Sequence, residues 1–318
     1  MRKNPLGKSG ILVTPVGMGV LTVGRTQLNL SIDEGADVVR YALERGINFL
    51  DTAEYYETYP YIRQALKGGK FAPVIASKSL SPSREGMRDA IEDARVAMDL
   101  DVIDIFLLHE VRGGDDFESR AGAWECLEDY KAKGLVKAIG ISTHHVDVAD
   151  MNAGLTESDI LFSLINKDSL GIRKGQKSGT KEDMALAILK NHQAGKGFFA
   201  MKALGGGNLT GSYLESMDYV TSLPGIDSVM VGLGSMEEVD RLAEYAEGSI
   251  DRGYAPDIRD KKIYIDQGDC EGCGLCLERC PNKAIFKNIS GLSEVNHSIC
   301  LTCGYCAPIC PVRAIILL

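Results

Sequence analysis

The sequence has little of what marks membrane, secreted or nucleic-acid-binding proteins. No apolar run in its 318 residues approaches the roughly 20 residues of a membrane span, and the opening stretch, MRKNPLGKSG, has no apolar signal-peptide core. Lysine and arginine number 35 against 44 acidic residues, and they are scattered among the acids, giving a formal net charge of -9. We therefore expect a cytoplasmic protein with no membrane and no nucleic-acid partner.

The Gly-rich turn that binds dinucleotides in open sheets is also missing, because the glycines of GMGVLTVG have the wrong spacing. From Gly17 to about Glu247, short apolar runs alternate with amphipathic segments, which is the pattern of βα units. Eight such units predict a closed (β/α)8 TIM barrel, with an open doubly wound sheet as the alternative. The predicted strands are residues 16–21, 47–51, 74–78, 102–109, 136–142, 160–166, 197–202 and 227–232.

A polar residue stands at or near the C-terminal end of six of these apolar runs. In a parallel barrel such positions converge on one mouth, where barrel enzymes keep their catalytic residues. A single polar residue there could simply face water, but six in register predict a site. These residues are Asp51, Lys78, His109, Ser142, Asn166 and Lys202.

The end of the chain has a different composition. Residues 251–262 are polar and read as a linker between a barrel domain, residues 1–250, and a C-terminal domain, residues 263–318. The pattern CxxCxxCxxxCPxxAI occurs at 270–285 and again at 300–315. Eight of the nine cysteines lie in these two runs, which in a reducing cytosol favours metal or redox chemistry over disulfides.

This spacing is that of bacterial two-cluster ferredoxins, in which three close thiolates and a fourth from the other run hold each [4Fe-4S] cluster. It predicts a small α+β ferredoxin-like domain with two clusters; zinc is the alternative for paired CxxC motifs. Cys126 lies in a helical stretch and is expected to be a core thiol. The predicted ligands are Cys270, Cys273, Cys276 and Cys310 for one cluster, and Cys300, Cys303, Cys306 and Cys280 for the other.

The barrel segment resembles the aldo-keto reductases. The resemblance rests on LGKSGILVTPVGMG, GINFLDTAEYY, VIASKS, DIFLLHE, WECLEDYKAKGLVKAIGIS and VMVGLGSMEEVDRL. It implies a (β/α)8 enzyme that uses NAD(P)H on a small carbonyl or alcohol substrate. It also implies a catalytic set of Tyr56, Asp51, Lys78 and His109, with Tyr55 as the alternative to Tyr56.

These residue types suit the implied chemistry. Hydride arriving at a carbonyl carbon leaves charge on oxygen, so an acid must stand there. We expect the Lys78 ammonium to lower the pKa of Tyr56, because a nearby cation favours the phenolate. Asp51 would then hold Lys78 as a buried partner, and a neutral His109 would orient the carbonyl oxygen.

The resemblance also implies a nicotinamide site. Ser142 would lie near the carboxamide, Asn166 and Met201 would belong to the same site, and Glu238 would lie near the adenine. The backbone of Gly234, Ser235 and Met236 would receive a phosphate at a helix N-terminus. Three positions depart from the family pattern: Thr143 replaces the usual Asn, Met201 a frequent Tyr, and Lys202 a small residue, so Lys202 faces either the substrate or an acidic partner. VGLGSMEEVD contains no cation for a 2′-phosphate, so NADH is expected no less than NADPH.

The joint presence of the two domains leaves three interpretations open. The clusters exchange electrons with the barrel site, or they form a docking module for a redox complex, or they are structural. Nicotinamide carries a hydride and each cluster one electron, so direct exchange normally needs a flavin between them, and a flavin is a further candidate cofactor. A ferredoxin- or flavodoxin-type protein is the expected redox partner. The 15 or so residues after residue 247, spanning up to ~50 Å when extended, are long enough to return the clusters to the barrel mouth.

Overall fold

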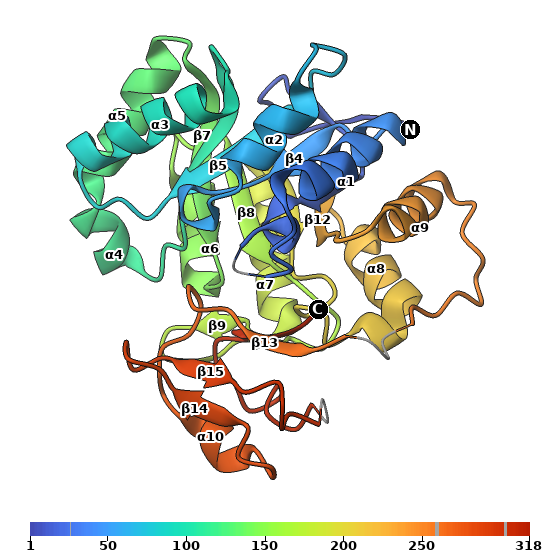
Figure 1. Cartoon of the computed structure of the whole chain (residues 1–318). Coiled ribbons are helices and arrows are strands. Elements are labelled where there is room, and N and C mark those ends of the chain that lie inside the picture. The colour runs from blue at the N-terminus through green and yellow to red at the C-terminus, as the bar shows by residue number, and fades with distance from the viewer. Residues whose placement is uncertain (26, 258–260, 302–303) are drawn as a thin grey trace.

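The computed structural model describes residues 1–25, 27–257, 261–301 and 304–318 (Figure 1). Eight parallel strands close into a barrel in the order β11-β12-β3-β4-β5-β6-β7-β8, which confirms the predicted TIM-barrel fold. The closure is made by β12, whose residues Val229–Gly232 pair in register with Val16–Gly19 of β3. The barrel strands are β3 (Val16–Gly19), β4 (Phe49–Asp51), β5 (Val74–Ser79), β6 (Ile103–Leu108), β7 (Val136–Thr143), β8 (Ile160–Leu164), β11 (Gly197–Met201) and β12 (Ser228–Gly232).

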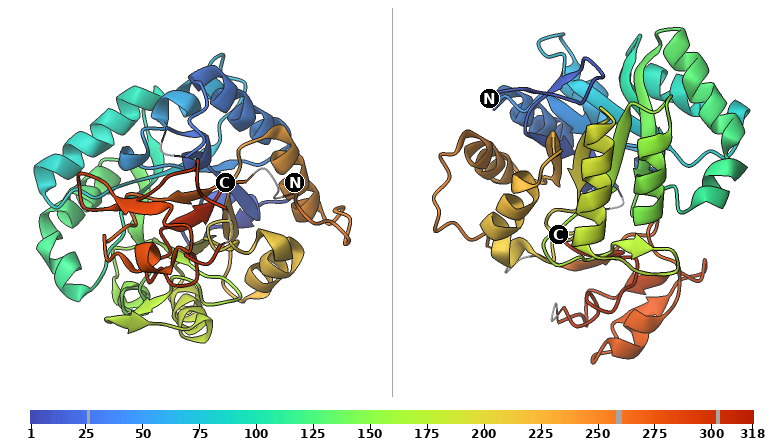
Figure 2. Two further views of the ribbon diagram at one scale, coloured as in Figure 1. Left: turned by 60° about the horizontal axis from the view of Figure 1, so that its bottom comes forward. Right: turned by 180° about the vertical axis from the view of Figure 1, so that it is seen from behind.

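Helices surround the barrel, as Figure 2 shows in its left view. Side-chain caps fix where several of them begin: Ser31 and Glu34 form a capping box at α1, and Thr180 and Asp183 form another at α7. None of the helices among the described residues is both long and apolar enough to cross a membrane. The barrel helices are α1 (Ile32–Glu44), α2 (Tyr59–Leu66), α3 (Arg84–Met98), α4 (Gly114–Ser119), α5 (Ala121–Ala132), α6 (Val146–Gly154), α7 (Lys181–Gln193), α8 (Tyr213–Ser222) and α9 (Met236–Glu247).

The core has two layers. One lies inside the barrel, where the rings of Phe49 and Phe162 pack against Phe199 with ring centroids 4.9 and 4.1 Å away. The hairpin of β1 (Asn4–Pro5) and β2 (Leu12–Val13) adds Leu6 and Val13 to this inner layer. The larger layer lies between the strands and the helices and includes Cys126, which is buried as expected. Burial on both faces explains why the strands read as continuous apolar runs.

The C-terminal unit is a small α+β fold. Its first and last strands, β13 (Ile263–Ile265) and β16 (Ile315–Leu317), pair antiparallel, and β14 (Ile285–Lys287) pairs antiparallel with β15 (Ser293–Val295). One short helix, α10 (Leu275–Arg279), follows the first cysteines. Both views of Figure 2 place this unit against one end of the barrel. That end is the C-terminal mouth, because Lys202, directly after β11, contacts Asp269 there.

The barrel loop after β11 packs closely against the last strand, β16. The Leu317 N–H donates to the Gly206 carbonyl at 2.9 Å, and the Asn208 side chain donates to the Ile315 carbonyl at 2.9 Å. Gly206 and Gly207 have φ of +63° and +84°, and a Cβ on Gly206 would lie 2.8 Å from the Ile316 side chain. A Cβ on Gly207 would collide with the Leu317 carbonyl. Glycine is therefore the residue that fits here, for both conformation and space.

One short hairpin and three 3-10 turns lie outside these layers. The hairpin of β9 (Arg173–Lys174) and β10 (Lys177–Ser178) belongs to the loop after β8. Single 3-10 turns occur at Val20–Val23, Glu54–Tyr56 and Thr210–Ser212. Several predicted strands are shorter than expected; in particular, β3 ends at Gly19 and β8 ends at Leu164, each two residues before the predicted end. Asn166 therefore lies beyond its strand.

Candidate active site and cluster sites

The buried ion pair at the barrel mouth joins Lys78 of β5 to Asp51 of β4. The Lys78 ammonium donates to both carboxylate oxygens of Asp51, at 2.7 and 2.9 Å, and to the Thr52 carbonyl at 2.7 Å. The Lys78 side chain is 1% exposed. Burial raises the pKa of Asp51 and lowers the pKa of Lys78, while the attraction between the two charges opposes both shifts. Each partner is thus needed to keep the other charged.

Tyr56 and His109 complete the predicted catalytic set. Tyr56 lies in the 3-10 turn after β4, and its Oη is 3.5 Å from Nε2 of His109, which follows β6. The two rings are edge to face with centroids 5.6 Å apart, and the Lys78 ammonium is 4.7 Å from the centroid of the Tyr56 ring. The structure therefore brings Tyr56, Lys78, Asp51 and His109 together. The ring of Tyr55 lies against Gly268 of the C-terminal unit, and Tyr55 lines the same small cavity as Tyr56.

The protonation state of Tyr56 differs from the expectation. Burial, followed by the charge of Asp51 and of further carboxylates, raises the pKa of Tyr56 well above 10. The predicted lowering by Lys78 is wrong for this structure, because burial of the Tyr56 ring is the largest cause of the shift and the Asp51 carboxylate paired with Lys78 adds to it. Burial and the nearby Lys78 charge lower the pKa of His109 well below 6.5, so its imidazole is neutral, as expected. Within the described part of the chain, Nδ1 of His109 is buried without a hydrogen-bond partner.

A cavity of about 370 Å³ extends from this site toward the start of α9. Of the residues predicted to bind nicotinamide, it is lined by Met201, Gly234, Ser235 and Glu238. Asn166 lines neither this cavity nor the smaller one beside it, because its amide is bonded to its own loop at Asp168 and Leu170. Met236 is 47% exposed and is also absent from the lining.

The start of α9 differs in detail from the predicted phosphate site. Glu238 accepts from the Gly234 N–H at 2.7 Å and from the Lys261 ammonium at 2.8 Å, so the backbone donor at Gly234 already has a partner. Lys261 and Arg241 line the same cavity. The sequence reasoning missed both cations: Arg241 stands one turn beyond Glu238 on α9, which its spacing could have indicated, whereas Lys261 arrives from the C-terminal segment.

A second cavity, of about 70 Å³, adjoins the catalytic set. It is lined by Tyr56, Lys78, His109 and Ser142 of the barrel, and also by Asp266, Gly268 and Asp269 of the C-terminal unit. Ser142 does not point its hydroxyl freely into this space, since its Oγ accepts from the Glu110 N–H at 2.8 Å. The C-terminal unit thus forms one wall of the space next to Tyr56.

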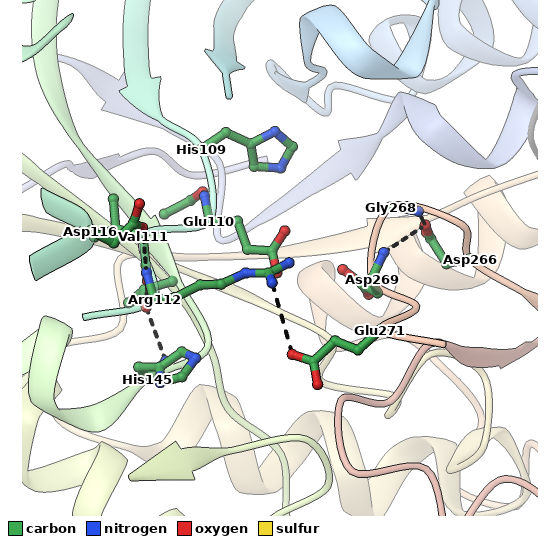
Figure 3. Close-up of polar contacts among 12 residues, drawn as sticks. His109, Glu110, Val111, Arg112, Asp116, His145, Asp266, Gly268, Asp269 and Glu271 are labelled. Atoms are coloured by element: carbon green, nitrogen blue, oxygen red, sulfur yellow. Dashed lines mark hydrogen bonds and ion pairs between the residues drawn. The ribbon is translucent and has the colours of Figure 1, made fainter. Parts of the chain in front are cut away.

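Two ion pairs hold that wall in place, and Figure 3 shows the one between Arg112 and Glu271. The Lys202 ammonium donates to Asp269, which directly precedes Cys270, and Arg112 lies 3.8 Å from Glu271, which directly follows it. Of the two alternatives for Lys202, the structure therefore shows the acidic partner. The first cysteine run faces the barrel mouth, because both neighbours of Cys270 contact barrel side chains there.

The cysteines gather in two sets that fit the predicted crossing of the fourth ligand. Burial raises the pKa of Cys276, and Cys310, Cys270 and Cys273 lie close enough to raise it further. Burial likewise raises the pKa of Cys306 to about 11, and Cys280, Cys276 and Cys300 lie close enough to raise it further, so Cys276 of the first set also lies near the second. Cysteines grouped in this way can hold one iron-sulfur cluster together, which isolated cysteines cannot do. Cys303, the remaining predicted ligand, lies outside the described residues.

A closed (β/α)8 barrel with a Tyr-Lys-Asp-His set at its mouth and two cysteine runs behind it defines a class of oxidoreductase with an iron-sulfur domain. Residues 15–247 match the Aldo/keto reductase family, and residues 262–311 match the 4Fe-4S dicluster domain. The chain belongs to the aldo-keto reductase family and carries an iron-sulfur domain fused to its barrel.

Individual relatives agree with this assignment. An uncharacterized oxidoreductase of Bacillus subtilis, YqkF, is 22% identical over 282 residues, covering 75% of this chain and 89% of that protein. A 6-dehydroglucose reductase of Novosphingobium aromaticivorans is 30% identical over 179 residues, covering 48% of this chain and 55% of that protein, so the chain spans about half the length of this relative. Among solved structures, the aldo-keto reductase AKR11C1 of Bacillus halodurans has the same fold, with a TM-score of 0.64 at 19% identity over 78% of this chain and 91% of that one.

Proposed function

We propose that the barrel interconverts a small carbonyl compound and its alcohol with a nicotinamide cofactor, and that the C-terminal unit exchanges electrons with that site through two [4Fe-4S] clusters. One observation carries the proposal: Tyr56 and His109 line the same 70 Å³ cavity as Asp269, the residue that precedes the predicted cluster ligand Cys270. A docking or structural module would not need to form a wall of the catalytic cavity.

The protonation states support defined roles for the barrel residues. Tyr56 stays protonated at neutral pH and is the proton donor to the carbonyl oxygen. His109, neutral, orients that oxygen through the nitrogen nearest to Tyr56. Lys78, fixed by Asp51, places positive charge next to the tyrosine ring, where it stabilises the phenolate that forms as the proton leaves. When bound, the nicotinamide would supply a hydride, which together with the Tyr56 proton completes the carbonyl reduction; the two clusters, carrying one electron each, would return two electrons to the oxidised nicotinamide, which also takes up a proton.

The residues available for the clusters are the two cysteine sets, Cys270, Cys273, Cys276 and Cys310, and Cys300, Cys303, Cys306 and Cys280. The residues available for the nicotinamide line the larger cavity between Met201 and Glu238. The stretch VGLGSMEEVD at the start of α9 has no cation, but Arg241 and Lys261 bring two cations to the same cavity. We therefore propose that NADPH binds at least as well as NADH. The small adjoining cavity favours a compact substrate, and a sugar-derived carbonyl, as in the name of one relative, is one such class.

Exposed apolar side chains on the C-terminal unit support a redox protein partner. Seven of the fourteen large hydrophobic side chains that are exposed in the described part of the chain lie between residues 275 and 309. Leu301 is 68% exposed, and Tyr305, 58% exposed, carries the Arg279 guanidinium 5.5 Å from its ring centroid. These residues neighbour the second cysteine set, which lies away from the Lys202 contact. A small acidic carrier of the ferredoxin or flavodoxin type fits an apolar surface bordered by a cation.

The decisive experiment follows the cluster absorbance of the anaerobic protein after NADPH or NADH is added, with and without free flavin. We expect bleaching that depends on the nicotinamide. Bleaching that occurs only after flavin is added would assign the two-electron to one-electron conversion to a flavin. Absence of bleaching under every condition, together with normal carbonyl reduction, would contradict electron exchange between the two units and leave the docking interpretation.

A further inference from the structure

Three side chains with metal-binding atoms meet where the barrel contacts the C-terminal unit. Glu110 follows β6, His144 follows β7, and Asp269 belongs to the C-terminal unit. One carboxylate oxygen of each acid and one ring nitrogen of the histidine all lie within 4.8 Å of one another. Figure 3 shows Glu110 and Asp269 on opposite sides of the contact. The three residues come from separate segments, so their convergence is a product of the two units being in contact.

His144 brings a largely buried imidazole to this group. The residue is 8% exposed, and its ring makes no hydrogen bond to any residue in the described ranges. Burial of a polar ring without a partner costs free energy, so such rings normally bind something. Burial also lowers the pKa of His144 to about 3, which leaves the imidazole neutral with a lone pair, the form that binds a metal.

The two carboxylates each keep an oxygen available. Lys202 donates to Oδ2 of Asp269, and Arg112 donates to Oε1 of Glu110 at 2.8 Å. The second oxygen of each acid has no hydrogen bond to the described residues. A cation could therefore bind these oxygens and the His144 nitrogen while both existing ion pairs stay in place.

The charge at the contact also favours a divalent cation. Arg112 and Glu271 face each other at the exposed rim, 46% and 44% exposed. At this contact the Lys202 ammonium and the Arg112 guanidinium face four carboxylates, those of Glu271 and of three inner acids, so two negative charges are left over when all four are ionised. Close approach of these acids in a half-buried place is costly without a cation. The three inner acids are Glu110, Asp266 and Asp269.

We propose that Glu110, His144 and Asp269 bind one divalent transition-metal ion, which joins the C-terminal unit to the barrel. One imidazole and two carboxylates suit Mn²⁺ or Zn²⁺, because these ions accept both nitrogen and oxygen ligands. Two ligands come from the barrel and one from the residue before Cys270, so the ion acts as a clamp across the contact. Glu110, His144 and Asp269 also line the 70 Å³ cavity beside Tyr56, so the ion would lie in the wall of the proposed substrate site, and its binding is tested separately from carbonyl reduction.

The test uses the full-length anaerobic protein with its clusters oxidised and loosely bound metals removed by a chelator, the cluster absorbance confirming that the clusters remain. Mn²⁺ is titrated in, and free Mn²⁺ is measured from its EPR signal. We expect one Mn²⁺ per chain, displaced by Zn²⁺. Glu110→Gln and His144→Gln should each weaken binding at least about 10-fold. Glu271→Gln and His145→Gln, at the same contact but outside the triad, serve as matched controls and should bind as the wild type does.

Two results would overturn the proposal: no stoichiometric Mn²⁺ binding by the wild type, or unchanged binding in both triad variants. Should a triad variant lose its clusters or its fold, the wild-type protein still decides the question. The EPR spectrum of bound Mn²⁺ must show coupling to an imidazole nitrogen, and a site made of oxygens alone would exclude His144.

Discussion

Replacing Lys78 by methionine tests whether the ion pair at the barrel mouth is as buried in solution as its contacts indicate. The change removes the ammonium that donates to both oxygens of Asp51, and it leaves that carboxylate 6% exposed. Loss of one partner from a buried ion pair costs about 3–5 kcal/mol, because the remaining charge has no compensation. At about 2–4 °C per kcal/mol, the melting temperature should fall by roughly 6–20 °C.

The measurement is thermal unfolding by far-ultraviolet circular dichroism under anaerobic conditions, with cluster content checked before each scan. The double variant Asp51→Asn, Lys78→Met removes both charges and should lose much less stability than the two single variants predict together. Lys137→Met is the matched control: Lys137 binds Asp104 at the same distance, 2.7 Å, but is 56% exposed, so the loss should be at most about 1 kcal/mol. A Lys78→Met protein that melts like the Lys137→Met protein would refute the reasoning.

Further predictions concern catalysis and the contact between the units. Tyr56→Phe should lower kcat for carbonyl reduction by about 10²-fold or more with unchanged cluster absorbance; full activity would remove Tyr56 as the proton donor. Because burial raises the pKa of Tyr56 well above 10 and lowers that of His109 well below 6.5, kcat/KM should be flat between about pH 8 and 9.5, above the titration of Glu110, whose pKa burial raises to about 7, and a fall within that range would contradict the state of Tyr56. Lys261→Ala should raise KM for NADPH about 10-fold more than KM for NADH, as a lost charged contact predicts; an equal change for both would place Lys261 away from a 2′-phosphate. Gly207→Ala should loosen the contact with Leu317 and expose the C-terminal unit to limited proteolysis, whereas Gly248→Ala, where no atom crowds a Cβ, should not.

The sequence predicted the barrel and the convergence of Asp51, Lys78 and His109, because parallel strands bring their C-terminal ends to one mouth whatever the loops do. It did not predict the pKa of Tyr56. A nearby lysine can be read from the spacing of motifs, but the burial that outweighs its charge depends on what covers the ring. Asn166 was predicted to belong to the cofactor site, but it lines neither cavity. The reason is local: its strand ends at Leu164, and its amide is hydrogen-bonded within the following loop.

The contacts between the two units could not be read from the sequence. The linker length showed that the chain could return to the mouth, but not which residues would meet there. Asp269 and Lys202 are 67 positions apart, and Lys261 reaches Glu238 only because the chain passes the start of α9 on its way back. Glu110 and His144 follow different strands and approach each other only in the closed barrel.

Gly206 and Gly207 of the barrel lie against the last strand of the C-terminal unit. The lack of room for a Cβ at both positions comes from Ile316 and Leu317, residues of the other unit. The steric requirement for glycine at 206 and 207 therefore arises from the contact between the two units. It offers a marker for comparative work: chains with glycines in this loop should seat an iron-sulfur unit on the barrel mouth, and chains without them should hold theirs on a free tether.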